Sequence, residues 1–371
     1  MNIRDIFHIY GTDGFEMTQI LLKAIEPEKL IPSQSSTIAI KPNLVVADKP
    51  EGGATTHPEI VIAIIEYLKE RGFHNISIVE SAWVADSTKR AFEVNGYYGI
   101  SSKYDVRLVD VKDDAYVTKT IHGVPVEFSK TIMETDFLIS LPVLKGHCQT
   151  SMTCALKNMK GCISDRSKRH SHTLGIHKPI AALNAIRSAD LIIVDSLNGD
   201  LDFEEGGNPV RTDRIFACRD SVLCDAYGAS LMGFETEEIE YIRLAEQFGV
   251  GTKNLDFAHI IFLNEPSEIA PPPRPTGKAI YLNQYIDSRS ACSACHGSLV
   301  HALKRLDEAN QLAGRFDQKI CVGQEFKTVQ DPDRIGVGIC TRGLGKSMPG
   351  CPPTALAMLE FLKSLNMHKS P

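Results

Sequence analysis

Three kinds of sequence feature are missing from this chain of 371 residues, and each absence excludes a class of protein. No apolar run approaches the roughly 18 residues of a membrane-spanning helix, so we expect no membrane partner. The net charge of −6 and the lack of a basic stripe argue against a nucleic-acid partner. There is no G-x-x-x-x-G-K-S/T run and no strand-linked G-x-G-x-x-G run, so neither ATP nor dinucleotide binding is indicated.

The N-terminus also lacks the features of a secretory signal, because an acid comes early, at Asp5, and no long apolar core follows. We therefore expect a cytoplasmic protein, in a compartment where disulfides are rare. The ten cysteines then need another explanation, and metal binding or catalysis is the usual one. At this length, two domains are expected instead of a single core.

Strand-like apolar runs alternate with helical patterns along the first 265 residues. The predicted strands are residues 36–40, 75–79, 106–110, 137–141, 191–195 and 258–262. The predicted helices are residues 60–70, 87–92, 179–186, 220–232 and 239–248. This alternation predicts an α/β fold with a mostly parallel sheet flanked by helices. In such sheets ligands bind at the carboxyl ends of the strands, and polar side chains gather at those ends here.

Residues 141–164 are the stretch around which a site can be built, because a strand leads into a polar turn and then a helical pattern. Apolar residues from Met152 to Ile163 recur at helical spacing, and Lys157 and Lys160 line an adjacent face. A turn that enters a helix offers free backbone N–H groups and a positive dipole end. The candidates for binding an anionic small-molecule substrate are Lys41, Asn43, Lys145, Lys157, Asn158 and Lys160.

Acid and imidazole side chains of the same region could move protons. The candidates are His147 in the turn, Asp195 at a strand end, Glu205 in an acidic glycine-rich loop, and Asp225 in an apolar helix. The acidic loop could instead hold a hard cation or form a capped turn. A buried acid such as Asp225 needs a partner, and a lysine is expected. The basic segment of residues 166–178 is either a solvated loop or a mobile lid over an anion.

A proline-rich break divides the chain, since four prolines occur within residues 271–275. Such a run fits neither a helix nor a central strand, so it predicts a stiff linker. The predicted organisation is an α/β domain with the lysine-rich anion site at residues 1–265, a linker at 266–279, and a smaller α/β cysteine-rich module at 280–371. Within this module we predict helices at residues 298–308 and 353–365 and strands at residues 319–322 and 335–339.

The C-terminal module holds four cysteines suited to one metal centre, Cys292, Cys295, Cys340 and Cys351. Two thiolates three positions apart and a distant pair supply four soft ligands, and nearby glycines let backbone N–H groups approach sulfur. A [4Fe–4S] cluster is the preferred cofactor, with structural zinc and unligated core cysteines as alternatives. The segment from Cys292 to His296 also has the formal spacing of c-type haem attachment, which normally occurs outside the cytoplasm.

The other cysteines are expected to be structural. Cys148, Cys154 and Cys162 are interpreted as small buried packing residues, with a second metal site or a reactive thiol as the alternative. Cys321 lies in a strand-like run and is predicted to pack in the core without binding metal.

Six longer motifs lie between residues 38 and 233. They are KPNLV at 41–45, ATTHP at 54–58, LPVLKGH at 141–147, ALKNMKG at 155–161, EEGGNP at 204–209 and CDAY at 224–227. Together they resemble the family catalogued as domain of unknown function 362. The resemblance implies an iron–sulfur protein with a cluster module beside this domain, but no particular reaction. The tandem ferredoxin pattern C-x-x-C-x-x-C-x-x-x-C-P is absent, and the dispersed four-cysteine module takes its place.

These features predict an iron–sulfur oxidoreductase, or an electron-transfer partner of one, from an anaerobic-type setting. It would act on an anionic small molecule and could exchange electrons with a redox partner protein. One alternative is a non-redox isomerase or lyase whose cluster only braces the fold. Another is a cluster carrier without catalysis. Reversible reduction of the cluster separates the first from the second, and cluster transfer to an apo acceptor would mark the third.

Overall fold

Two groups of elements make up the structure, a computed structural model that describes residues 1–84, 86–265 and 274–365. Unit 1 comprises Met1–Lys168 and Ile176–Pro275, and unit 2 comprises Arg169–Gly175 and Thr276–Pro371. Most of the predicted linker, residues 266–273, lies outside the described residues. Its last two positions belong to helix α11 (Lys278–Asn283). Part of the predicted basic segment, Arg169–Gly175, belongs to unit 2.

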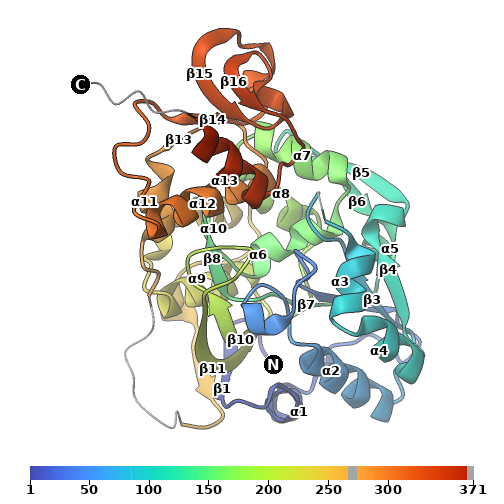
Figure 1. Ribbon diagram of the computed structural model, residues 1–371. Helices are drawn as coiled ribbons and strands as arrows, with labels where there is room; N and C mark the ends of the chain where they lie inside the picture. Colours follow the sequence, from blue (N-terminus) through green and yellow to red (C-terminus); the bar gives the residue numbers. More distant parts are fainter. Residues whose placement is uncertain (85, 266–273, 366–371) are drawn as a thin grey trace. The chain divides into compact units, whose positions relative to one another are not determined.

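Unit 1 is built on an eight-stranded sheet (Figure 1). Its strands are β1 (Asp5–Tyr10), β2 (Ile38–Pro42), β3 (Ile76–Glu80), β4 (Arg107–Asp110), β7 (Phe137–Leu141), β10 (Leu191–Asp200), β11 (Pro209–Cys218) and β12 (His259–Phe262). Their order across the sheet is β12-β1-β11-β10-β7-β2-β3-β4. Only β11 runs antiparallel to its neighbours, and the other neighbouring strands of this sheet are parallel. The predicted α/β fold with a mostly parallel sheet is therefore confirmed.

Helices cover both faces of this sheet, and each face has its own hydrophobic core. The helices over one core are α1 (Gly14–Ile25), α2 (Pro58–Glu70), α3 (Thr88–Val94) and α4 (Tyr97–Tyr104). Those over the other are α8 (His177–Ile186), α9 (Ser221–Leu231) and α10 (Glu240–Gln247). Successive side chains of β2 point to opposite faces of the sheet. Ile38 and Ile40 therefore belong to the first core and Ala39 belongs to the second. A strand covered on both faces needs successive apolar residues, which is why the fully buried strands β2, β3 and β7 are recognisable in the sequence.

Residues 145–163 differ from the predicted turn and continuous helix. Strands β8 (Lys145–His147) and β9 (Ser151–Thr153) form a small antiparallel hairpin, followed by helix α6 (Ala155–Asn158) and the 3-10 turn η4 (Met159–Cys162). A helix cannot run through the hairpin, because Ser151 has a φ of 65° and Cys154 has a φ of −150°. The helical spacing was misleading because apolar side chains of β9, α6 and η4 enter the same core.

A second hairpin, of β5 (Tyr116–Ile121) and β6 (Val124–Ser129), leads into helix α5 (Lys130–Glu134) and was not predicted. Helix α7 (Asp165–Thr173) occupies most of the basic segment.

Unit 2 is the smaller α/β module that the sequence predicted. Its strands β13 (Ile286–Ser288), β14 (Ile320–Val322), β15 (Asp331–Val337) and β16 (Leu344–Met348) form a parallel sheet in that order. Its longer helices are α12 (Ser293–Glu308) and α13 (Ala355–Ser364). Helix α12 begins at Ser293 instead of residue 298, which places Cys295 in its first turn.

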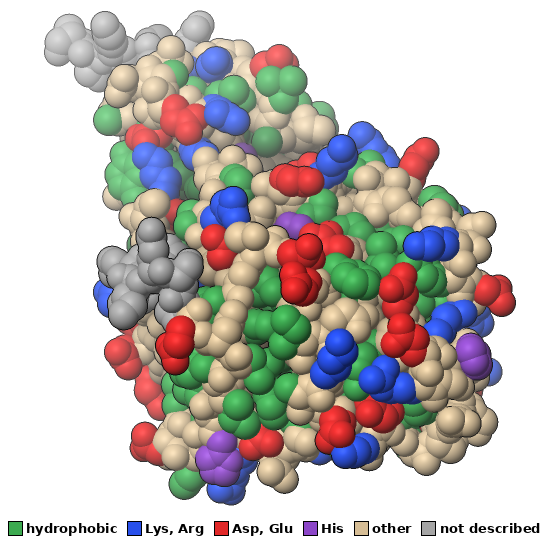
Figure 2. Space-filling view, turned by 90° about the horizontal axis from the view of Figure 1, so that it is seen from below, with side chains coloured by type: hydrophobic (Ala, Val, Ile, Leu, Met, Phe, Trp, Pro, Cys, Tyr) green, Lys and Arg blue, Asp and Glu red, His purple; other side chains and the backbone are tan. Residues whose placement is uncertain are grey.

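The surface carries mixed charge. On the face drawn in Figure 2, acidic and basic side chains are interspersed, and hydrophobic side chains gather between them. Within the described residues, no helix combines the length and the apolar character needed to cross a membrane.

The cap of α9 provides a first testable prediction. Asp220 Oδ1 accepts the backbone N–H groups of Val222 and Leu223 at 2.8 and 3.0 Å, and Oδ2 accepts that of Thr252 at 2.9 Å. Asp220→Ala should lower the free energy of unfolding by about 2 kcal/mol, because buried N–H groups lose their acceptor. Urea denaturation measures the change. The control Asp13→Ala removes a cap of α1 that accepts one exposed N–H group and should cost about 1 kcal/mol or less. Equal losses in both variants would contradict this account.

Candidate functional site

A buried ion pair joins the ends of β2 and β3. Lys41 Nζ lies 2.9 Å from Glu80 Oε2, and both side chains are buried. The ammonium also donates to the Pro42 carbonyl at 3.0 Å and to Asn158 Oδ1 at 3.2 Å. These three acceptors use the three N–H bonds of a lysine, so Lys41 has no donor left for a substrate anion. The structure thus joins two of the predicted binding residues, Lys41 and Asn158, in one internal network.

The chain closes over this ion pair at Gly161. A Cβ atom there would lie 2.0 Å from Glu80 Oε1 and 2.6 Å from Lys41 Nζ, so only glycine fits without a shift. Lys168 extends the network, because its Nζ donates to the hydroxyl of Ser81 and, at 3.2 Å, to its carbonyl. Burial lowers the pKa of Lys168 to about 8. Sequence reasoning missed this lysine, since nothing distinguished it from the other basic residues of its segment.

A second buried network centres on Glu204, which follows β10. Its carboxylate pairs with Lys157 Nζ, and its Oε2 lies 2.9 Å from His147 Nε2. Burial alone would raise the pKa of Glu204, but His147 and Lys157 hold that pKa well below its usual range. The proton-transfer residue predicted from the sequence was the next one, Glu205, which is half-buried. Side-chain alternation marks the buried face of a strand but not of a turn, so no pattern pointed to Glu204.

His147 is held in one tautomer. Its Nδ1 accepts the backbone N–H groups of Gln149 at 3.0 Å and Thr150 at 3.1 Å. The neutral ring therefore carries its proton on Nε2, the nitrogen that faces Glu204. Burial lowers the pKa of His147 to about 4, so the ring is neutral near pH 7. The site can use His147 as a fixed proton donor at Nε2.

Lys145 differs from the other lysines of the site. Its buried Nζ donates to the Ala54 carbonyl at 2.5 Å, and it forms no ion pair with any described residue. Burial lowers the pKa of Lys145 to about 8. The turn that ends in Ala54 requires glycine at position 53. Gly53 has a φ of 80°, and an added Cβ would lie 2.7 Å from the backbone nitrogen of Asp200. Lys145 keeps N–H bonds that an anion could accept.

A partly exposed pair, His57 and Asp195, lies at the start of α2. The backbone nitrogen and Nδ1 of His57 both lie 2.8 Å from Asp195 Oδ2, and Oδ1 accepts the N–H of Leu197 at 3.2 Å. The His57 side chain is 14% exposed, whereas that of Asp195 is buried. Burial alone would lower the pKa of His57, but the adjacent carboxylate raises it to about 9. Asp195 was a predicted proton-transfer residue, and His57 had no assigned role.

The remaining predicted residues have other surroundings. Asn43 is held by its backbone, whose N–H donates to Thr56 Oγ1 at 2.8 Å. Lys160 is half-buried in η4. Asp225 accepts the backbone N–H of Leu156 at 3.3 Å and lies beside two thiols. The prediction that a lysine pairs with Asp225 is wrong, because this carboxylate forms no ion pair within the described part of the chain.

Unit 2 places its four predicted metal ligands near one another. Cys292 is the N-cap of α12, Cys295 lies in its first turn, Cys340 lies in the 3-10 turn η8 (Ile339–Thr341), and Cys351 follows β16. Burial raises the pKa of Cys295 to about 12, and the charges of the other three thiols add to this effect. Such an influence requires the sulfur atoms to be neighbours. Cys351 is exposed, and the other three are half-buried.

The surroundings of these thiols suit anionic sulfur. Helix α12 begins directly after Cys292 and places its positive dipole end beside that thiol. Gln324 Nε2 lies 3.8 Å from Cys292 Sγ. The backbone approaches Cys295 at Gly338, where an added Cβ would lie 3.7 Å from Sγ. Cys321 is fully buried in β14 and packs in a small hydrophobic core.

Comparisons with known proteins concern mainly unit 1. Residues 38–230 match the family described as "Domain of unknown function (DUF362)". The thylakoid-associated protein sll1697 of Synechocystis sp. is 30% identical over 135 residues, which are 36% of this chain and 41% of that protein. The lactate racemase apoprotein of Thermoanaerobacterium thermosaccharolyticum is 13% identical, with a TM-score of 0.41, over 63% of this chain and 57% of that one. This chain thus spans less than two thirds of either protein.

The two histidines predict opposite pH dependences of stability. The pKa of His57 is raised from 6.5 to about 9, so its contribution is present below pH 6.5 and is lost as the pH rises toward 9. The pKa of His147 is lowered from 6.5 to about 4, so its contribution is lost as the pH falls from 6.5 toward 4. Between pH 6.5 and 9, the free energy of unfolding of the wild type should fall by up to about 3 kcal/mol because of His57. In the His57→Gln variant this fall should be absent.

Urea unfolding across this pH range measures both slopes. His147→Gln is the matched control, since it should flatten the acid slope and leave the alkaline slope unchanged. An alkaline slope that survives in the His57 variant would show that another group titrates there.

Proposed function

Because the chain belongs to the DUF362 family and carries a separate four-cysteine unit, we propose that it is an iron–sulfur protein of the oxidoreductase or electron-transfer class. The observation that carries this proposal is that the segments holding Cys292, Cys295, Cys340 and Cys351 meet. Cys292 and Cys295 lie at the start of α12, Cys295 Sγ lies beside Gly338, and backbone hydrogen bonds join residues 338 and 339 to residues 348 and 350. Four cysteine thiolates are the usual ligands of a [4Fe–4S] cluster. A bound cluster would supply one-electron transfer.

The spacing of the sulfur atoms favours a cluster over a single zinc ion. A tetrahedral zinc ion, bound at about 2.3 Å, holds its sulfur ligands within about 4 Å of one another. No three of these four fully described cysteines have sulfur atoms that all lie within 4.8 Å of one another. A four-iron cluster is larger and holds its thiolates further apart. Ligand type, number and spacing therefore fit the cluster.

The exposure of the cysteines supports electron exchange with a partner protein. Cys351 is exposed and the other three are half-buried, so their sulfur atoms lie near the surface of the chain. The proposed setting is the cytoplasm of an organism with anaerobic-type metabolism, where thiols stay reduced.

The proposed substrate is an anionic small molecule held at Lys145. Glu80 and Glu204 already neutralise Lys41 and Lys157, whereas Lys145 has no carboxylate partner within the described part of the chain. The ion pair of Lys41 and Glu80, together with Asn158, would hold the neighbouring strands in position without contacting the anion. Among the predicted binding lysines, Lys145 is therefore the proposed primary contact of the anion.

Two histidine–carboxylate pairs would serve the proton steps of the reaction. His147 presents its Nε2 proton beside Glu204, and His57 is cationic near neutral pH beside Asp195. Both lie in the lysine-rich unit and provide a donor with a fixed orientation. Glu205 stays a half-buried candidate next to them.

The same pairs favour a second candidate, an isomerase or lyase. Proton transfer without net electron transfer is the chemistry of that class, and the cluster would then only brace unit 2. A cluster that cannot be reversibly reduced would favour this candidate over electron transfer. A cluster carrier would instead transfer its iron and sulfide to an apo acceptor.

Serine replacement tests the cluster ligands. Replacing Cys292, Cys295, Cys340 or Cys351 should lower iron per chain and change the electron paramagnetic resonance signal of the reduced protein, because a closed site loses one thiolate. Anaerobic purification with iron and sulfide analysis provides the measurement. Cys321→Ser, at a buried thiol of the same unit, is the control and should keep full iron. A variant of the four with full iron and a native signal would remove that cysteine from the ligand set.

A lysine replacement tests the anion site. Lys145→Met should weaken binding of inorganic phosphate or a small dicarboxylate about 10- to 150-fold, because a lost charge-assisted hydrogen bond costs about 1.5–3 kcal/mol. Thermal unfolding at increasing ligand concentration measures this change. Lys119→Met, on the exposed side of β5, is the control for lost charge. Equal ligand responses in the wild type and the Lys145 variant would exclude Lys145 as the anion contact.

A further inference from the structure

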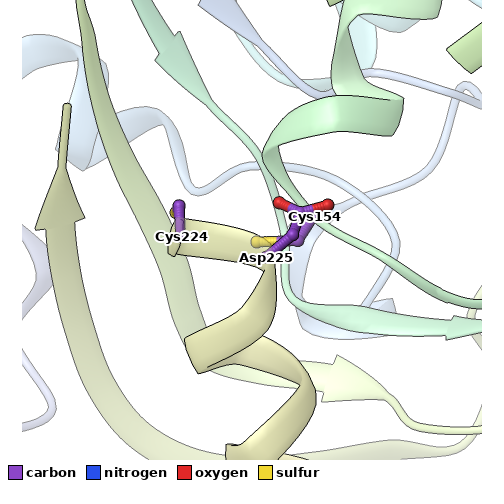
Figure 3. A group of neighbouring side chains, drawn as sticks. All are labelled: Cys154, Cys224 and Asp225. Atoms are coloured by element: carbon purple, nitrogen blue, oxygen red, sulfur yellow. The ribbon is translucent and has the colours of Figure 1, made fainter. Parts of the chain in front are cut away.

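A second group of metal-ligand side chains lies inside unit 1. Cys154 immediately precedes α6, and Cys224 and Asp225 lie in the first part of α9. Figure 3 shows the side chains of these two segments converging. One ligand atom from each residue lies within 4.8 Å of the others, and all three residues are fully buried. Residues distant in sequence therefore offer two sulfur atoms and one carboxylate oxygen to a single point.

The carboxylate of this group lacks a balancing cation. Asp225 accepts the backbone N–H of Leu156 at 3.3 and 3.4 Å, but no lysine, arginine or histidine pairs with it among the described residues. A buried carboxylate costs free energy unless it is neutralised by a proton, a cation or a metal ion. Burial raises the pKa of Asp225 to about 7, so without metal this carboxyl group is only partly ionised near neutral pH.

We propose that Cys154, Cys224 and Asp225 form a second metal site, for a thiophilic divalent ion of the zinc class. Zinc binds cysteine sulfur at about 2.3 Å and carboxylate oxygen at about 2.0–2.2 Å in a tetrahedron. Three ligand atoms within 4.8 Å of one another can occupy three of the four positions of this tetrahedron, and the fourth position is left to a further ligand. The mixed sulfur–oxygen set lies in unit 1 and shares no residue with the four thiols of unit 2, so this site does not depend on the proposed cluster.

Proton release accompanies binding at this site. Cysteine binds zinc as the thiolate, so the two thiol protons leave to solvent when the ion binds. Because the site is fully buried, metal enters during folding or local opening, and exchange with a chelator is slow.

The location of this site gives it a positioning role. Lys157 and Asn158 lie on α6, the short helix that follows Cys154, and they supply contacts to Glu204 and Lys41. A metal bridge from Cys154 to α9 would fix the start of α6. The ion would then hold the lysine-rich edge in place without touching substrate.

The test uses the full-length protein, unfolded and refolded anaerobically with reductant and about one equivalent of Zn²⁺ or Co²⁺ per chain. The X-ray absorption spectrum of the bound zinc should show sulfur together with oxygen ligands. Cys154→Ser and Asp225→Asn should each lose this zinc. Cys162→Ser, at another fully buried thiol of unit 1, is the matched control and should retain it.

The double replacement Cys292→Ser and Cys340→Ser separates this site from unit 2. This variant should keep the sulfur–oxygen zinc signal, whereas the proposed cluster fails in it. Zinc that disappears from this variant, or that shows sulfur ligands alone, would overturn the proposal. The spectrum of the unmutated protein decides the matter even when the Cys154 and Asp225 variants do not fold.

Discussion

The buried ion pair of Lys41 and Glu80 is the constraint around which unit 1 is arranged. Two charges removed from water are tolerable only when every donor and acceptor is matched, and removing one partner of such a pair costs about 3–5 kcal/mol. The pair joins β2 to β3, and α6 and η4 also contribute residues to its surroundings. Asn158 and the Pro42 carbonyl complete the shell of the ammonium, and Gly161 covers the pair because no side chain would fit. The edge of the sheet is rigid for electrostatic reasons as well as for packing.

This internal matching changes the meaning of a lysine-rich sequence. A cluster of lysines predicts an anion site, but two of these charges, those of Lys41 and Lys157, are already balanced by carboxylates from other parts of the chain. What distinguishes a binding residue is an unused donor, and Lys145 has one because its Nζ donates only to the neutral carbonyl of Ala54 among the described residues. The internal carboxylates also limit the net positive charge at this edge. For the anion site that we propose, they would favour a small anion with one or two contacts over a polyanion.

The sequence predicted the elements and residues whose signal is local. Strand β7 has the predicted bounds of residues 137–141, because a parallel strand buried on both faces is a continuous apolar run. Lys41 and Asp195 were singled out because polar residues at the ends of such strands share one edge, and the structure places each of them in a pair with an oppositely charged or imidazole side chain. Strand β11 was missed, since its first half is not buried and its apolar run is short. Glu204 and His57 depend on contacts between segments far apart in sequence, and no local spacing encodes such contacts.

The two groups of cysteines show how the surroundings of sulfur decide its chemistry. In unit 2 the thiols lie near the surface, beside a helix N-terminus and a backbone rich in glycine, where thiolates gain N–H donors. In unit 1 Cys154 and Cys224 are fully buried beside a carboxylate, and only a bound cation would favour their ionised form. The first environment suits a cofactor that exchanges electrons, and the second suits an ion that never changes its charge. The redox centre and the structural metal that we propose would therefore use sulfur ligands that differ in exposure.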